Sequence, residues 1–243
     1  NNDPNPKVFL KYEDLINQVK LNSIEIDLVI IATPSGLHAN QAIKAAELGI
    51  NVCTEKPMAT NWKDGLRIVE SCEKNKVNLF VVKQNRCNKT LKLVKKQIDT
   101  GRFGEIIMMN INVFWQRPQS YYDLAPWRGT KKLDGGALMN QASHYVDLLE
   151  WLGGAVKNVS ASVATISRKI ESEDTAALLV EWENGGLGTM AVTMLTYPEN
   201  LEGSITILGK KGTVKIGGKA VNKIEHWCFE DYSEDDNKIN EAS

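Results

Sequence analysis

Hydrophobic positions in residues 12–86 alternate between a helical and a strand spacing. Leu15, Ile16 and Val19 recur at helical intervals within residues 12–20, and residues 27–32 form a short apolar run rich in β-branched side chains. A run of this kind is typical of a strand that is buried on both faces of a parallel sheet. The alternation continues with helices predicted at 38–48, from Asn61 or Asp64 to residue 72, and at 90–99, and with strands predicted at 50–54 and 77–82.

This order of helices and strands indicates a parallel sheet with right-handed crossovers, which is the arrangement of a Rossmann-type α/β domain. Such a domain normally opens with a strand, a G-x-G-x-x-G turn and a helix. The sequence contains no such turn, and the glycines at 185–188 fit a hairpin better. We therefore expect residues 1–102 to form a Rossmann-like domain that lacks its first βα part, with an open apolar sheet edge.

The pattern changes from Glu105 onward. Residues 106–115 form one long predicted strand, the segments 183–186 and 209–212 resemble hairpin turns, and one helix is expected at 136–151. We expect residues 103–243 to form a large open antiparallel sheet domain, so the fold class is α/β plus α+β. The further strands are predicted at 156–167, 176–182, 187–195, 204–208 and 213–216, and the acidic tail at 230–243 is expected to be mobile.

Composition narrows the class of protein. The 243 residues include 42% hydrophobic and 24% charged side chains, as in packed globular proteins, and a net charge of -1 argues against a nucleic-acid partner. The four cysteines form no CxxC pair and have no histidine at metal-ligand spacing, so we expect reduced thiols in a cytoplasm and no metal site. No apolar run approaches the roughly 20 residues that span a bilayer, so no membrane partner is expected.

Polar segments follow the predicted parallel strands at 32–38, 55–57 and 83–86. Ligands of open α/β sheets bind beyond the carboxyl ends of the strands, so these segments are candidates for a binding site. Lys56 stands between Glu55 and a proline, and burial of this amine would lower its pKa toward the range useful for proton transfer. The alternative interpretation is an exposed Lys–Glu neighbour pair that contributes little.

A second candidate is the segment 134–147, in which two glycines lead into the predicted helix. Asn140 and His144 are four residues apart and share one helix face. Asp147 follows one turn later and could fix the tautomer of the histidine. The alternative interpretation is that His144 is a hydrogen-bonded core residue among the leucines that follow it.

These motifs together resemble the glucose–fructose oxidoreductase and inositol dehydrogenase family over about residues 8–216. The resemblance implies a first half that binds NAD, with NADP not excluded, and a second half whose sheet face forms the substrate pocket. It also implies that Lys56 and His144 flank the reacting carbon as the catalytic pair. The residues expected to contact the cofactor are Ala32, Thr33, Pro34, His38, Glu55, Lys56, Gln84 and Trp127.

The segments 84–88, 127–130 and 139–144 are similar to a narrower group, the UDP-N-acetylglucosaminuronate 3-dehydrogenases. Many family members carry Asp at the position of Asn140, whose amide can bind a sugar but cannot accept a proton. This resemblance implies oxidation of the sugar at C3, with the hydroxyl proton passing to His144 or Lys56. The residues expected to bind this nucleotide sugar are Arg86, Asn88, Tyr122, Arg128 and Asn140.

The two arginines suit a uronate or a pyrophosphate because guanidinium forks match such anions, but each could instead be an exposed surface residue. Two other functions stay open at this point. The enzyme could oxidise a free polyol or inositol, or the chain could be a regulatory protein that binds a nicotinamide nucleotide without turnover. The resemblance also implies a homo-oligomer, either a dimer or a tetramer.

Overall fold

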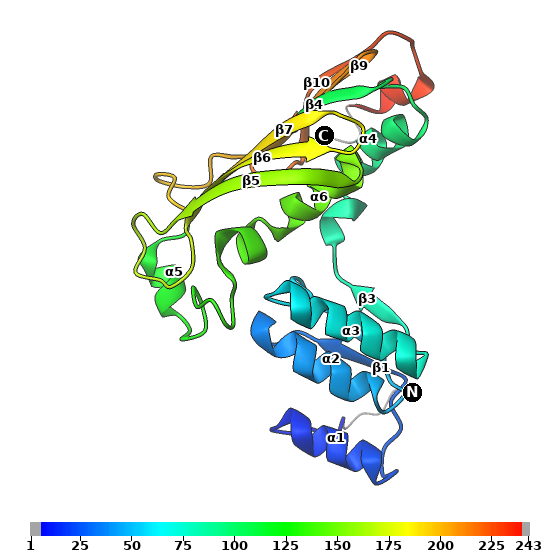
Figure 1. Ribbon diagram of the computed structural model, residues 1–243, viewed down its shortest axis with the longest axis vertical. Coiled ribbons are helices and arrows are strands. Elements are labelled where there is room, and N and C mark those ends of the chain that lie inside the picture. Colours follow the sequence, from blue (N-terminus) through cyan, green and yellow to red (C-terminus); the bar gives the residue numbers. More distant parts are fainter. Residues whose placement is uncertain (1–5, 240–243) are drawn as a thin grey trace. The chain divides into compact units, whose positions relative to one another are not determined.

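The computed structural model describes residues 6–239, and its contacts divide the chain into two compact units, Asn1–Val82 and Lys83–Ser243 (Figure 1). We call them the N-terminal and the C-terminal unit. The helix α4 (Lys89–Asp99) belongs to the C-terminal unit, because Leu91 and Val94 are buried in that unit's core. The functional division at residue 102 stays a prediction.

The N-terminal unit has the predicted alternation of helices and parallel strands. Its sheet has the order β1-β2-β3, and both pairs of neighbouring strands are parallel. The strands are β1 (Leu28–Ile31), β2 (Asn51–Thr54) and β3 (Leu79–Val81), and the helices are α1 (Tyr12–Lys20), α2 (His38–Ala46) and α3 (Trp62–Asn75), with a 3-10 turn η1 (Ser35–Leu37).

The core of this unit lies under α2 and α3, where Ala42, Val52 and Ile68 are fully buried. On the opposite face, Ile30 and Phe80 lie in register across β2 and are 69% and 54% exposed. The prediction that the first strand is buried on both faces is therefore wrong for the described residues, because helices cover only one face of β1. β1 is an edge strand, as expected.

The C-terminal unit is built on a seven-stranded sheet with the order β10-β9-β8-β4-β7-β6-β5. All neighbours are antiparallel except β4 and β7, which run parallel, so the sheet is mixed. The strands are β4 (Ile106–Phe114), β5 (Val156–Ala164), β6 (Thr175–Trp182), β7 (Leu187–Thr193), β8 (Glu202–Gly209), β9 (Gly212–Gly217) and β10 (Lys223–Phe229). The last of these was not predicted, because charged side chains interrupt its apolar alternation.

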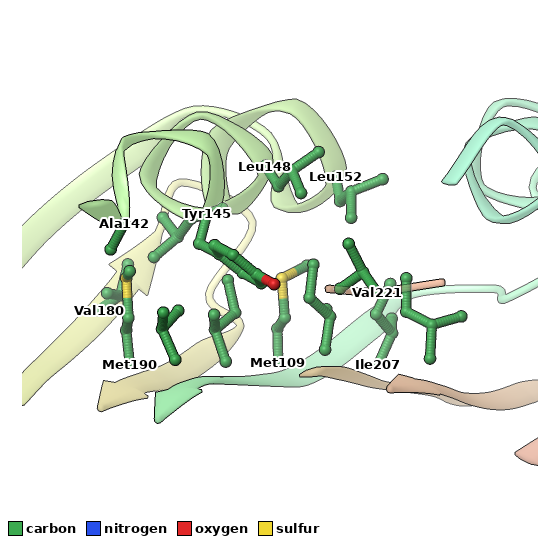
Figure 2. Close-up of a cluster of buried hydrophobic side chains, with 14 of the residues drawn as sticks. Met109, Ala142, Tyr145, Leu148, Leu152, Val180, Met190, Ile207 and Val221 are labelled. Atoms are coloured by element: carbon green, nitrogen blue, oxygen red, sulfur yellow. The ribbon is translucent and has the colours of Figure 1, made fainter. Parts of the chain in front are cut away.

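The helix predicted at 136–151 consists of two pieces, a π-helical turn η3 (Ala137–Gln141) and the helix α6 (Ser143–Gly153). Figure 2 shows Tyr145, Leu148 and Leu152 pointing from α6 toward Met109 and Ile207 on the sheet. All five side chains are at most 1% exposed. Full burial of a side chain of this size contributes about 1.5–3 kcal/mol, so this contact fixes α6 on the sheet.

The predicted mobile tail is instead ordered as far as the structure describes it. Residues Glu234–Lys238 form the 3-10 turn η4, whose carboxylates bind basic residues near the end of α4. Asp235 pairs with Lys96 at 2.8 Å, and Asp236 receives two hydrogen bonds from Arg102 at 2.6 and 2.7 Å. Residues 240–243 lie outside the described part. Between residues 6 and 239, no helix has the length and apolar character needed to cross a membrane.

Candidate functional site

The carboxyl edge of the parallel sheet carries most of the residues predicted to contact the cofactor. Because β1 and β2 are parallel, the segments that follow them lie at the same edge. The buried His38 links the two segments. Its Nε2 lies 2.8 Å from the carbonyl oxygen of Thr33, and its Nδ1 lies 2.8 Å from the carbonyl oxygen of Pro57.

His38 is only 1% exposed, so it supports this edge from behind. Ala32 and Thr33 are exposed at the end of β1, and the Thr33 hydroxyl donates to the Gln41 side chain at 2.6 Å. At the end of β2, Lys56 is half-buried, and its peptide bond to Pro57 is cis. The Lys56 backbone N–H donates a hydrogen bond to the Glu55 carboxylate at 3.1 Å, so this carboxylate is held against the main chain.

In the C-terminal unit, the backbone conformation before η3 explains why two glycines stand there. Gly135 and Gly136 have φ angles of 88° and 90°, a region that side chains rarely adopt. A Cβ atom on Gly136 would lie 2.2 Å from a Glu173 carboxylate oxygen. That carboxylate accepts the Leu138 N–H at 2.9 Å, so the turn approaches Glu173 as closely as glycine permits.

Asn140 is 8% exposed, and its side-chain amide donates to the carboxylate of Asp134. Asp134 is itself 2% exposed and also accepts the Gly129 N–H at 2.6 Å. This buried carboxylate therefore joins the loop before η3 to the π-helical turn. Asn140 was expected to bind the sugar, and its side-chain NH2 group already donates one hydrogen bond inside the protein, to Asp134.

His144 lies in the first turn of α6 and is 8% exposed. One turn later, the two carboxylate oxygens of Asp147 accept Nε and Nη2 of Arg86, each at 2.7 Å. Both oxygens of this carboxylate thus bind the arginine, and the expected role of Asp147 in fixing the His144 tautomer stays a prediction. The Arg86 guanidinium also lies 5.3 Å from the centre of the Trp151 ring.

Lys83 completes this cluster. Its Nζ donates to the Ser143 carbonyl oxygen at 3.3 Å and lies 3.9 Å from Asp147. Burial lowers the pKa of Lys83, and the charge of Arg86 lowers it further, while Asp147 acts in the opposite direction. The basic segment at 83–86 thus holds the first turn of the helix that carries His144.

The other predicted residues of this unit lie in two places. Gln84 is exposed in the 3-10 turn η2 (Gln84–Cys87), and Asn88 is half-buried at the start of α4. Tyr122 is buried in the short helix α5 (Gln119–Asp123), and burial, followed by the charges of Tyr121, Asp134 and Asp174, raises its pKa to about 12. Trp127 and Arg128 follow α5, with the guanidinium 5.5 Å from the indole centre.

A pocket of about 520 Å³ opens beside α5. Its lining includes Arg117, Tyr121 and Gln141. The sequence offered Tyr121 as a residue that could flank the sugar or simply pack, whereas Arg117 was not assigned to the site. One signal could have found Arg117, since it is a basic residue just beyond the end of an apolar strand, β4. Lys56 belongs to the N-terminal unit and His144 to the C-terminal unit. No group of His, Cys, Asp and Glu able to hold a metal ion occurs in the part of the chain described.

Comparison with known families identifies the fold. Residues 2–83 match the description "Oxidoreductase family, NAD-binding Rossmann fold", and residues 91–215 match the "GFO/IDH/MocA C-terminal domain". The chain belongs to the GFO/IDH/MocA oxidoreductase family. The predicted family and fold class are thereby confirmed, and the N-terminal unit matches an NAD-binding Rossmann fold.

Two solved structures are similar to nearly the whole chain. The WlbA dehydrogenase of Bordetella pertussis, in complex with NADH and UDP-GlcNAcA, is 56% identical with a TM-score of 0.93, covering 98% of this chain and 67% of that one. WlbA of Chromobacterium violaceum, with the same ligands, is 56% identical with a TM-score of 0.93, covering 97% and 67%.

A curated relative is more distant. The 1-carboxy-3-chloro-3,4-dihydroxycyclo hexa-1,5-diene dehydrogenase of Comamonas testosteroni is 28% identical over 193 residues, which cover 77% of this chain and 47% of that protein. The chain spans about half the length of the curated relatives it matches. It covers 47% of this dehydrogenase and 55% of the levoglucosan dehydrogenase of Pseudarthrobacter phenanthrenivorans.

Proposed function

We propose that the protein carrying this chain oxidises the C3 hydroxyl of a UDP-N-acetylhexosaminuronate with NAD, as a step in the synthesis of a surface polysaccharide. The observation that supports this proposal is the 56% identity to two WlbA dehydrogenases whose structures contain NADH and UDP-GlcNAcA. Identity at this level extends over 97–98% of the chain and includes both units.

The residues of the N-terminal unit fit a nicotinamide dinucleotide. The strand ends place the small exposed side chains of Ala32 and Thr33 beside the segment that carries Lys56, so the backbone of this edge is open to a flat ligand. Ala32, Thr33, Pro34, Glu55 and Lys56 would hold the cofactor there, with His38 as their support. When bound, NAD supplies the acceptor for the hydride of the sugar carbon.

Lys56 and His144 are the groups we assign to the proton of the C3 hydroxyl. Neutral imidazole can accept this proton, and a lysine ammonium can stabilise the alkoxide oxygen that develops. Asn140 cannot accept a proton, so its side chain is restricted to binding. Its amide donates to Asp134, which fixes the orientation of the side chain, and an amide group can hydrogen-bond a sugar hydroxyl or an acetamido group.

The proposal is tested with the purified full-length protein by following nicotinamide reduction with NAD and with NADP. The substrates are UDP-N-acetylglucosaminuronate, inositol and glucose. Turnover with the nucleotide sugar alone supports the proposal. Turnover with a free polyol would replace it by the alternative substrate class, and bound cofactor without any turnover would favour the regulatory interpretation.

The catalytic pair is tested by Lys56→Ala and His144→Ala, each of which should lower turnover by at least roughly 10²-fold, the scale of a positioned acid–base group. Lys63→Ala and His226→Ala are matched controls, because both side chains are exposed on the surface. Wild-type turnover in both active-site variants would refute the assignment.

We also propose that the protein is a cytoplasmic homo-oligomer, a dimer or tetramer. The outer face of the large sheet exposes apolar side chains on neighbouring strands, among them Leu179, Leu187 and Met108 at 62%, 55% and 37%. Exposed apolar patches of this kind mark association surfaces. All four cysteines are free thiols, which agrees with a reducing compartment. A monomeric mass by light scattering would contradict the oligomer.

A further inference from the structure

Two arginine side chains in the C-terminal unit lie against one tyrosine ring. The guanidinium carbon of Arg128 is 4.1 Å from the centre of the Tyr121 ring, and that of Arg117 is 5.6 Å from it. Cations are attracted to an aromatic face, but this attraction leaves their net charge in place. The arrangement therefore concentrates positive charge around Tyr121.

The other well-buried or clustered arginines of this unit have carboxylate partners. Arg86 forms two hydrogen bonds to Asp147, and Arg102 forms two to Asp236. By contrast, Arg117 donates only to neutral oxygens among the described residues, those of Gln141 at 2.9 Å, Gln116 at 2.7 Å and Asn200 at 3.3 Å.

Arg128 shows the same lack of a counter-charge. Its Nε and Nη1 atoms are buried and find no hydrogen-bond partner within residues 6–239. A third arginine, Arg168, donates from Nε to the Arg117 carbonyl oxygen at 2.6 Å. The nearby carboxylate of Asp174 accepts backbone N–H groups at 166–168, each at 2.9 Å, and so is already occupied.

Buried charges in proteins are normally paired, so an unpaired set of arginines points to a counter-charge supplied by a ligand. The side chain of Arg117 is held ready for one. Tyr121 accepts a hydrogen bond from the Gln141 amide at 2.9 Å, and the Gln141 oxygen accepts Nε of Arg117 at 2.9 Å. This relay fixes the plane of the guanidinium, and its Nη2 makes no hydrogen bond in the described part of the chain.

Arg117, Tyr121 and Gln141 all line the pocket of about 520 Å³ beside α5. Its volume falls within the range of about 300–1,000 Å³ that is usual for small-molecule sites. Pro118 and Leu124 add apolar surface to the same pocket, which suits a flat base or a sugar ring next to an anion. The pocket thus combines one oriented guanidinium with apolar walls.

We propose that this pocket is the subsite for the diphosphate group of the nucleotide sugar, with Arg117 as the direct contact. Arg128, whose guanidinium carbon is 4.1 Å from the centre of the Tyr121 ring, adds to the positive potential. A diphosphate carries more charge and more acceptor oxygens than a carboxylate, and so matches a pair of arginines better than a uronate does. This inference deepens the proposed function and rests on it.

The test is equilibrium binding of UDP and of free glucuronate to the full-length protein by titration calorimetry. UDP carries the diphosphate without the uronate, and glucuronate carries the reverse. We expect Arg117→Gln to weaken UDP binding by at least roughly tenfold, the scale of a charge-assisted hydrogen bond, while glucuronate binding is unchanged. Lys131→Gln, which removes an exposed charge from a neighbouring loop, is the matched control and should change UDP binding less than about twofold.

Arg117→Lys keeps the charge and much of the packing, so it should recover part of the UDP affinity and separates the subsite from a loss of folding. Unchanged UDP binding in Arg117→Gln, or a loss confined to glucuronate, would overturn the inference. If the protein oxidises the nucleotide sugar and Arg117→Gln binds UDP normally, only the subsite fails. If Arg117→Gln loses UDP binding while the wild type oxidises no UDP-sugar, the subsite stands and the proposed function fails.

Discussion

Arg86 could either bind the substrate or stabilise the fold through its contact with Asp147, and a substitution of this arginine distinguishes the two roles. The sequence assigns Arg86 to the substrate, whereas the structure commits both Nε and Nη2 to Asp147 in the helix that carries His144. We predict that Arg86→Gln lowers the free energy of unfolding and leaves the KM for the nucleotide sugar within about twofold of wild type.

The expected magnitude follows from burial. Removing one partner of a buried ion pair costs about 3–5 kcal/mol, and an exposed pair contributes about 0–1 kcal/mol. The Asp147 side chain is 12% exposed and that of Arg86 is 42% exposed, so the pair lies between these limits. In this variant the Lys83 amine, which lies 3.9 Å from the Asp147 carboxylate, still offsets part of the negative charge of that carboxylate. We therefore expect a loss of about 2 kcal/mol, which corresponds to a Tm lower by about 4–8 °C for a protein of this size.

The assay is thermal unfolding combined with steady-state kinetics on the same preparations. Arg67→Gln is the control, because it removes a pair with Asp64 whose side chains are 50% and 33% exposed, and it should change stability by less than about 0.5 kcal/mol. A KM raised tenfold or more in Arg86→Gln, with an unchanged Tm, would refute this reasoning and restore Arg86 as a substrate contact.

Three further variants test the fold of the C-terminal unit. Gly136→Ala should lower stability by more than about 1 kcal/mol in thermal unfolding, and by more than Gly154→Ala, which has a similar φ of 91° but no atom near its Cβ position. Hydrogen bonds from Arg102, opposed by burial, lower the pKa of Asp236 to about 2. This carboxylate therefore stabilises the protein above about pH 4, and in urea unfolding the stability difference from Asp236→Asn should vanish as the pH falls toward 2. The Tyr145 hydroxyl is buried without a hydrogen-bond partner among the described residues, so Tyr145→Phe should not lower stability; a loss above about 1 kcal/mol would contradict this.

The elements of the N-terminal unit were predictable because apolar runs and helical repeats directly record local structure. The strand ending at Ile31 and the helix beginning at His38 both follow this pattern. The exposure of Ile30 was not predictable, because it depends on which elements cover the sheet. β10 escaped prediction for a related reason, since an edge strand can carry charged residues such as Lys223 and Glu225 on its exposed positions.

The candidate site was predictable only where a motif carries it. Lys56 and His144 stand in recognisable segments, and the glycines before η3 have the left-handed backbone that such a motif implies. The partner of Asp147 was not predictable, because Arg86 is 61 positions away in the sequence. The same holds for Arg117, whose significance comes from a ring and an amide brought together by the fold.

Isotope transfer from the sugar to the cofactor identifies the carbon that is oxidised, which we propose to be C3. The full-length protein is incubated with NAD and UDP-N-acetylglucosaminuronate that carries deuterium at C3, and the mass of the reduced nicotinamide is measured. We predict that the reduced cofactor gains one deuterium and that Lys56→Ala and His144→Ala suppress this transfer. Reduced cofactor without deuterium would contradict it, because the hydride would then come from another carbon.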